Sequence, residues 1–149
     1  HAPDRSPPTL TLTNETPMTR TAVTIPNAPV PAGPYSHGVV AGGFLFTAGF
    51  GPQDPATGEV VAGGVYEQTQ QVLRNIANVL ATNGATMDDV VKVTAHLEHL
   101  DRDFAEYNRA YAEFFTAPYP VRTTVGSRLA NILVEIDVVA QLPTADAQA

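Results

Sequence analysis

Residues 65–83 read VYEQTQQVLRNIANVLATN and form the most regular pattern in the sequence. Mainly apolar side chains recur in this stretch every three or four residues: Val65, Thr69, Val72, Leu73, Ile76, Val79 and Leu80. That spacing places them along one side of a helix, and Glu67, Gln68 and Arg74 fall away from that side. Gly84 then follows as a C-terminal stop. The stretch predicts an amphipathic helix with one face against a core.

The segment after this helix combines a strand pattern with a second helix pattern. Residues 90–98 (VVKVTAHLE) alternate between apolar and polar types, as in a half-buried strand. Asp101 is expected to cap a helix that runs to about residue 116, before Pro118. The apolar side of this helix would consist of Phe104, Tyr107, Tyr111, Phe114 and Phe115.

Short β-type segments lie on both sides of this central part. Further strands are expected over residues 20–25, 37–41, 44–48, 121–128 and 132–141. Gly42-Gly43 is typical of a two-residue hairpin turn, and a second hairpin is expected between the last two strands.

The predicted order of elements is β-β-β-α-β-α-β-β, which indicates an α+β fold with two helices on one face of a mixed sheet. The residues of the uncovered face would include Phe46, Val93 and Val139, depending on register. Charged residues make up 15% of the chain, below the usual quarter or so. We therefore expect the uncovered face to pack against other subunits.

The composition excludes several classes of function. Lys and Arg total 8 against 15 Asp and Glu, a formal net charge of −7, which is unsuited to neutralising nucleic-acid phosphates. The absence of Cys excludes disulfides, thiol nucleophiles and Cys-bound zinc. The apolar runs are too short for a transmembrane helix, and the first 25 residues lack the apolar segment of a signal peptide. We expect a cytoplasmic protein without a nucleic-acid or membrane partner.

One domain is expected within the 149 residues. Residues 1–17 are rich in Pro and Thr and lack a helical or strand period, so we interpret them as a disordered leader or a non-native remnant. The domain is expected over residues 18–142, followed by a disordered tail over residues 143–149.

Arg122 is the first candidate for a ligand-binding residue. It lies within residues 120–125 (PVRTTV), an otherwise uncharged and β-branched strand, where a cation kept from water needs a partner. That partner is either a carboxylate ligand held by the planar guanidinium or an acidic side chain on a neighbouring strand. The sequence leaves both alternatives open.

Glu135 and Asp137 lie two residues apart on one face of a predicted strand. Either this face reaches solvent, or one carboxylate is a base in a low-dielectric pocket, with its pKa raised towards neutrality. If residues 129–131 form a three-residue turn, Arg122 and Glu135 point to opposite faces of the sheet. They can then share a pocket only through an even loop, a bulge or different subunits.

Other polar and aromatic positions are weaker candidates. Asn108 lies on the apolar side of the second helix, either as a core hydrogen-bonding group or as a pocket wall. Tyr35 lies on a Pro-rich loop, where it covers a site or merely packs. His96, Glu98 and His99 do not complete a set of metal ligands, because His99 points away from the other two, and we expect no metal.

Four segments in order resemble motifs of one known family. Residues 33–38 (GPYSHG) resemble its GPYS-x-G segment, and residues 103–115 resemble DF-x-x-(hydrophobic)-N-x-x-Y-x-x-FF. Residues 120–125 resemble P-x-R-[ST]-x-V, and residues 133–140 (LVEIDVVA) resemble the closing VEI-[ED]-x-[IV]-A strand. Together these segments resemble the RidA/YjgF family of reactive-intermediate deaminases.

The resemblance implies a chorismate-mutase-like α+β fold and a homotrimer with pockets between subunits. It also implies hydrolysis of 2-imino and enamino acids, such as 2-iminopropanoate and 2-iminobutanoate, to 2-keto acids and ammonia. By position, Arg122 would hold the substrate carboxylate and Glu135 would activate the attacking water. Tyr35 and Asn108 would line the pocket, and the Gly49 backbone would face the ligand. Because an imine carbon is already electrophilic, we expect neither a metal nor a cofactor.

The chain departs from the family pattern at several positions. Phe50 stands where S-G-Q would place Gln, and Thr124 stands where Cys is frequent. Both are expected to line the substrate pocket, and the loop before the last strand is shorter than usual. We expect these changes to alter substrate preference. Two alternatives stay open: a non-catalytic trimer that binds a small keto acid, and a ribonuclease, which the net charge of −7 disfavours.

Overall fold

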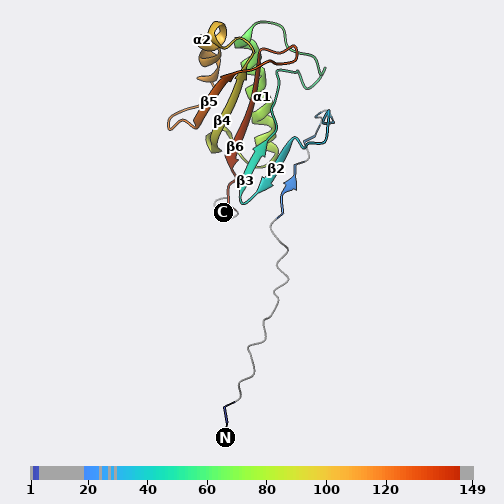
Figure 1. The fold of residues 1–149 in the computed structure, drawn as a ribbon, viewed down its shortest axis with the longest axis vertical. Helices are drawn as coiled ribbons and strands as arrows, with labels where there is room; N and C mark the ends of the chain where they lie inside the picture. The colour runs from blue at the N-terminus through green and yellow to red at the C-terminus, as the bar shows by residue number, and fades with distance from the viewer. Residues whose placement is uncertain (1, 4–18, 24, 27, 29, 145–149) are drawn as a thin grey trace.

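The structure is a computed structural model that describes residues 2–3, 19–23, 25–26, 28 and 30–144. Figure 1 shows a mixed sheet with two helices, which confirms the predicted α+β fold class. The six strands lie in the order β1-β2-β3-β6-β4-β5. Their bounds are β1 Thr21–Ala22, β2 Gly38–Ala41, β3 Phe44–Thr47, β4 Val90–Leu97, β5 Val121–Gly126 and β6 Val134–Gln141. Most of the predicted leader and tail lies outside the described residues.

The first predicted helix, α1, spans Val65–Thr82. At its start the Gly64 backbone N–H donates to Glu67 Oε2 at 2.8 Å. Gln68, which the pattern assigns to the polar side, is instead buried, and its Oε1 accepts a hydrogen bond from Leu133 N at 2.8 Å. Within the described part of the chain, no helix combines the length and the apolar composition needed to cross a membrane.

The second helix, α2, spans Leu100–Tyr111 and is shorter than predicted. It begins after His99 rather than at Asp101. It ends early because the next turn tightens, with the Glu113 and Phe114 N–H groups bonded to carbonyls three residues back. This turn directs Phe115 into the core, where its ring centre lies 4.5 Å from that of Tyr111.

The last two strands do not form the predicted hairpin. β4 lies between them, parallel to β5 and antiparallel to β6. The reason is α2, which connects β4 to β5 as a crossover and so returns the chain in the parallel direction (Figure 1). The predicted hairpin between β2 and β3 is confirmed, and Gly42 and Gly43 take positive φ angles of 58° and 81° there.

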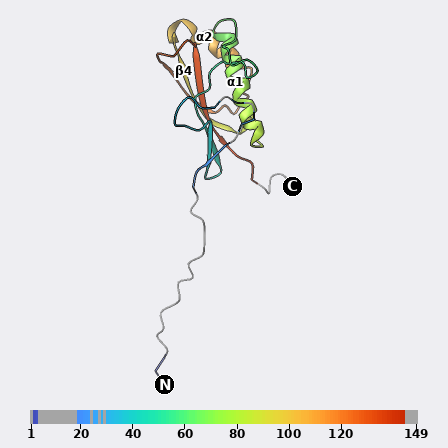
Figure 2. The same cartoon turned by 90° about the vertical axis from the view of Figure 1, so that its right-hand side faces the viewer.

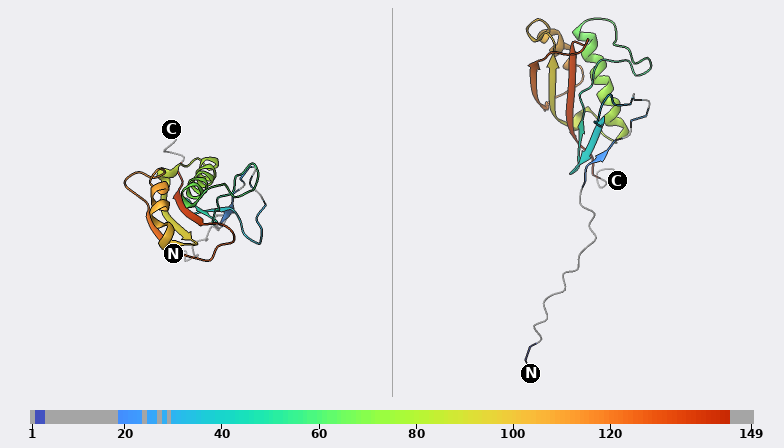
Figure 3. Two further views of the ribbon diagram at one scale, coloured as in Figure 1. Left: turned by 90° about the horizontal axis from the view of Figure 1, so that it is seen from above. Right: turned by 45° about the vertical axis from the view of Figure 1, so that its right-hand side comes forward.

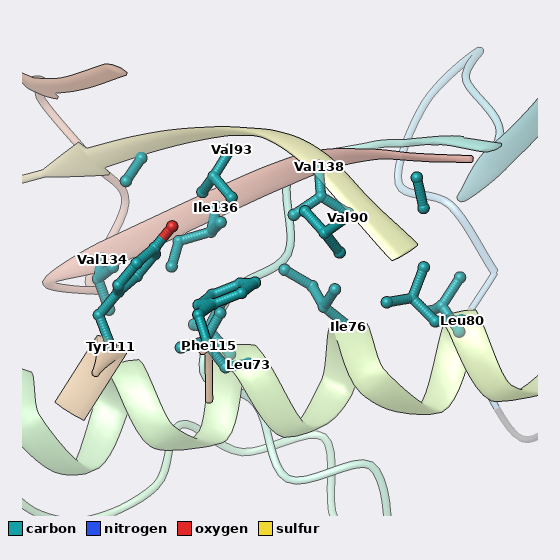
Figure 4. Packing of buried hydrophobic residues seen from close by; sticks show 14 of the residues in the cluster. Leu73, Ile76, Leu80, Val90, Val93, Tyr111, Phe115, Val134, Ile136 and Val138 are labelled. Atoms are coloured by element: carbon teal, nitrogen blue, oxygen red, sulfur yellow. The ribbon is translucent and has the colours of Figure 1, made fainter. Parts of the chain in front are cut away.

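Both helices cover the same face of the sheet, as predicted (Figures 2 and 3). The core lies between them and the strands. Figure 4 shows Leu73 and Ile76 of α1 facing Ile136 and Val138 of β6. Val93 of β4 belongs to this buried face rather than to the open one, because its register partner Val138 also faces the helices.

The opposite face of the sheet is open in one chain. Phe46 of β3 and Val139 of β6 are register partners on this face, as predicted, and Phe46 is 44% exposed. Val121 and Val125 of β5 are also exposed. The open face therefore presents apolar side chains on the interior strands β3 and β6 and on the edge strand β5.

Candidate active site

Glu135 lies at the wall of a cavity that residues of α1 also line. On β6 it is the register partner of His96 on β4. Its side chain lines a cavity of about 830 Å³ beside the loops that precede β2 and follow β3. Three other predicted site residues, Tyr35, Gly49 and Phe50, line the same cavity, and so does His37.

The loop after β3 is held directly against Glu135. Phe50 N donates to Ile136 O at 2.8 Å, and Ile136 N donates to Phe50 O at 3.1 Å. This pair of bonds places the Gly49 backbone beside the carboxylate. A Cβ atom at Gly49 would stand 2.0 Å from Glu135 Oε1 and 2.9 Å from its Cδ. A side chain at position 49 would therefore displace the Glu135 carboxylate.

Three rings line the cavity in a row. His37 lies between Tyr35 and Phe50, with ring centres 6.4 Å and 6.1 Å apart respectively. The Tyr35 hydroxyl accepts a hydrogen bond from Ala32 N at 3.3 Å, although the side chain is 52% exposed. Sequence reasoning did not single out His37, and the signal that could have found it is its place inside the GPYSHG motif.

The described lining of the cavity contains acidic side chains but neither Lys nor Arg. The acidic side chains are those of Asp54 and Glu135. A ligand carboxylate in this cavity therefore needs a cation from elsewhere.

Arg122 lies on the other face of the sheet. It pairs in register with the buried Val93, so its side chain leaves β5 towards α2. Its Nη1 donates to Asn108 Oδ1 at 2.8 Å. The central guanidinium carbon also lies 4.7, 5.2 and 5.9 Å from the ring centres of Tyr111, Tyr107 and Phe104.

Arg122 is exposed in the single chain, contrary to the expectation of a cation kept from water. The ion pairs among the described residues join Arg102 to Asp103 and Arg109 to Glu106. The alternative of a cross-strand acidic partner is therefore wrong. A guanidinium held by a neutral amide and by aromatic rings keeps its charge for an external anion.

Thr124 belongs to the surroundings of Arg122, two residues further along the same face of β5. Its Oγ1 lies 3.3 Å from the Tyr107 hydroxyl. Burial raises the pKa of Tyr107, while Thr124 and Arg122 lower it in part. Burial also raises the pKa of Tyr111 to about 12. Both tyrosines are therefore neutral at neutral pH and do not neutralise Arg122.

Asp137 shares the open face with Glu135. It is the register partner of Thr94, between Lys92 and His96. Burial raises the pKa of Asp137 above the ordinary aspartate value, and His96 and Lys92 act in the opposite direction. In the part of the chain that the structure describes, no group of three or more His, Cys, Asp or Glu side chains is arranged to hold a metal ion.

The predicted site residues thus form two groups within one chain. The Glu135 group consists of Tyr35, Gly49, Phe50 and Glu135, and the Arg122 group consists of Asn108, Arg122 and Thr124. His96 is the register partner of both Glu135 and Val125, so Glu135 shares a face with Val125. Arg122 is three residues from Val125 and points to the opposite face. A three-residue hairpin turn would have given the same directions, but that hairpin is absent and the pairing of both strands with β4 sets them.

Comparisons with known proteins point to one family. A sequence model of the family described as Endoribonuclease L-PSP matches residues 25–142. The chain is 48% identical over 116 residues to a RutC family protein of Pyrococcus horikoshii, which covers 76% of this chain and 91% of the relative. It is 37% identical over 141 residues to Reactive Intermediate Deaminase A, chloroplastic, of Arabidopsis thaliana, which covers 93% of this chain and 75% of the relative. The crystal structure of E. coli TdcF with bound serine is similar with a TM-score of 0.75 and 33% identity, covering 83% of this chain and 99% of that one.

The structure defines a small α+β protein with a cavity lined by polar and aromatic side chains. The chain belongs to the Endoribonuclease L-PSP family, which is the RidA/YjgF family that its motifs resemble. This family includes reactive intermediate deaminases.

Proposed function

We propose that the protein hydrolyses 2-imino and enamino acids to 2-keto acids and ammonia, as a homotrimer with its sites between copies. The observation that carries the proposal is the separation of the two charged groups. Among the described residues, the Glu135 cavity has neither Lys nor Arg in its lining, and Arg122 lacks an acidic partner. Each group is half of a site for a small organic anion.

The edge of the sheet supports a site shared between copies. β5 is an edge strand that pairs with β4 alone among the described strands, and it carries the exposed Arg122. Val121 and Val125 beside it are exposed apolar residues. If the open face of one copy packs against the β5 edge of the next, these side chains become buried and Arg122 reaches the neighbouring Glu135 cavity.

The chemistry follows from the two side chains. Arg122 would bind the substrate carboxylate through two parallel hydrogen bonds. Glu135 would accept a proton from water as the water oxygen adds to the imine carbon, and would return that proton to the nitrogen. This gives a carbinolamine, whose hydroxyl proton would then pass through Glu135 to the nitrogen as the carbon–nitrogen bond breaks, so that ammonia leaves and the keto acid remains. A base of this kind contributes about 10² to 10⁴ in rate.

The experiment is a competition for imino acid released in situ by an amino-acid oxidase, with semicarbazide as the trap. The protein should lower the amount of semicarbazone and raise the release of keto acid. Arg122→Ala should lose this effect. Unchanged keto-acid release, or equal release with Arg122→Ala, would reject the deaminase proposal.

A second candidate is a non-catalytic binder of small amino or keto acids. The TdcF structure with bound serine favours it. Such a protein would bind a keto acid saturably without turnover, and Glu135→Gln would leave binding intact. A ribonuclease is disfavoured because a chain with a net charge of −7 is poorly suited to bind RNA, and a salt titration of RNA binding would test this.

A further inference from the structure

We propose that Tyr107 is a positioning residue for Arg122. The inference deepens the proposed function and rests on it, since it concerns the cation assigned to the substrate carboxylate. The Tyr107 ring centre lies 5.2 Å from the guanidinium carbon. The Tyr107 hydroxyl lies 3.3 Å from Thr124 Oγ1, on the residue that follows Arg122 by two positions on the same face of β5.

Tyr107 acts from inside the protein rather than on the ligand. Its side chain is 0% exposed, so any effect on binding must pass through Arg122 or Thr124. At this position the motif that the chain resembles requires only a hydrophobic residue. The hydroxyl is therefore not needed to fill the core, and it is free to contact Thr124.

The attachment of β5 explains why this contact matters. β5 is an edge strand, paired with β4 on one side. Two side-chain hydrogen bonds join it to α2 among the described residues, Arg122 to Asn108 and Tyr107 to Thr124. The second bond fixes the backbone from which Arg122 projects. A guanidinium that is already fixed loses less entropy when it binds an anion.

The test compares Tyr107→Phe, Thr124→Val and the double variant. Two quantities are measured: the Kd for 2-oxobutanoate, a product of the proposed reaction, and the NMR order parameter of the Arg122 Nε–Hε group. We expect each single variant to weaken binding about two- to fivefold, the effect of one modest hydrogen bond, and to lower the order parameter. The double variant should bind 2-oxobutanoate no more weakly than Thr124→Val does. In each variant the KM for the imino acid should rise with little change in kcat.

Two further variants separate positioning from general stability. Thr124→Ser retains the hydroxyl, so its Kd and its Arg122 order parameter should be closer to the wild-type values than those of Thr124→Val. Tyr66→Phe removes a hydroxyl that donates to Glu113 on the outer side of the helices at 2.6 Å, and it should leave Kd and the order parameter unchanged. Equal effects of Tyr66→Phe and Tyr107→Phe would overturn the inference, as would additive losses in the double variant.

These experiments distinguish a failure of the positioning role of Tyr107 from a failure of the proposed function. If the wild type does not hydrolyse imines but the Tyr107 and Thr124 variants still lower the Arg122 order parameter, the deaminase proposal fails and the positioning role stands. If the wild type is active but Kd, KM and the order parameter are unchanged in the variants, the positioning role fails and the deaminase proposal stands.

Discussion

The position of the Glu135 carboxylate depends on the glycine at position 49, which has no side chain. Gly49 lies so close that a Cβ there would meet Glu135 Oε1 at 2.0 Å. The backbone cannot move away easily, because both the N–H and the C=O of the next residue, Phe50, are hydrogen-bonded to Ile136. The carboxylate is the group that would yield to any larger residue at position 49.

Gly49→Ala should therefore lower the proposed imine hydrolysis by about 10²-fold, since a small misplacement of a reacting group has an effect of this size. Binding of 2-oxobutanoate through Arg122 should change less. Steady-state kinetics and calorimetry measure the two effects. Gly64→Ala is the control, because its Cβ would meet nothing nearer than Glu67 Oε2 at 3.8 Å. Full activity of Gly49→Ala would contradict the assigned role of Glu135.

Asp137 gives a pH-dependent prediction. Burial raises its pKa in the folded protein, so the folded state binds the proton more tightly than the unfolded state does. The contribution of Asp137 to the stability of the folded state is therefore fully present below the ordinary aspartate pKa. It is lost as the pH rises through the raised pKa. Asp137→Asn should raise Tm at pH 7, and the gain should vanish below the ordinary pKa of 3.8. Thermal unfolding from pH 3 to 7 measures this, and an equal gain at every pH would refute the electrostatic cause.

At the scale of elements, α1 supplies the core that supports β6 and hence Glu135. Ile76 is fully buried and faces the strand in Figure 4. Ile76→Ala should lower the free energy of unfolding by about 2–5 kcal/mol, through lost apolar burial and the cavity left behind. Denaturant unfolding at one fixed protein concentration measures it. The exposed Arg74→Ala should change stability by less than about 0.5 kcal/mol, and similar losses in both variants would contradict this assignment of the core.

The helices and strands also show which structural features local sequence patterns can predict. The apolar spacing of α1 predicts its start and its buried side, except for Gln68. The end of α2 was predicted five residues too late because residues 112–116 retain helical composition while the turn tightens. Strand order was not predictable from the alternation of β4, β5 and β6, because alternation defines faces and not neighbours.

At the scale of the whole molecule, the site is divided between two faces of the sheet. If copies share the site, mixing two inactive variants should restore activity. Arg122→Ala supplies an intact Glu135, and Glu135→Gln supplies an intact Arg122. After the variants are unfolded and refolded together in equal amounts, about a quarter of the interfaces should contain both intact groups if copies assemble at random.

The recovered activity, measured by the competition assay, should therefore be about a quarter of the wild-type value. Separately refolded variants, mixed without exchange of subunits, are the control and should stay inactive. An absence of recovery in a mixture shown by mass measurement to contain mixed oligomers would reject the shared site.

The sequence by itself determined the helical side of α1 and the β2–β3 hairpin. These follow from local periodicity and from glycine conformation, which act within a few residues. Only the tertiary structure decided that β4 separates β5 from β6, that Gly49 touches Glu135 and that Asn108 holds Arg122. Those contacts join segments far apart in the chain, and they depend on the crossover of α2 and on the packing of the core rather than on any local pattern.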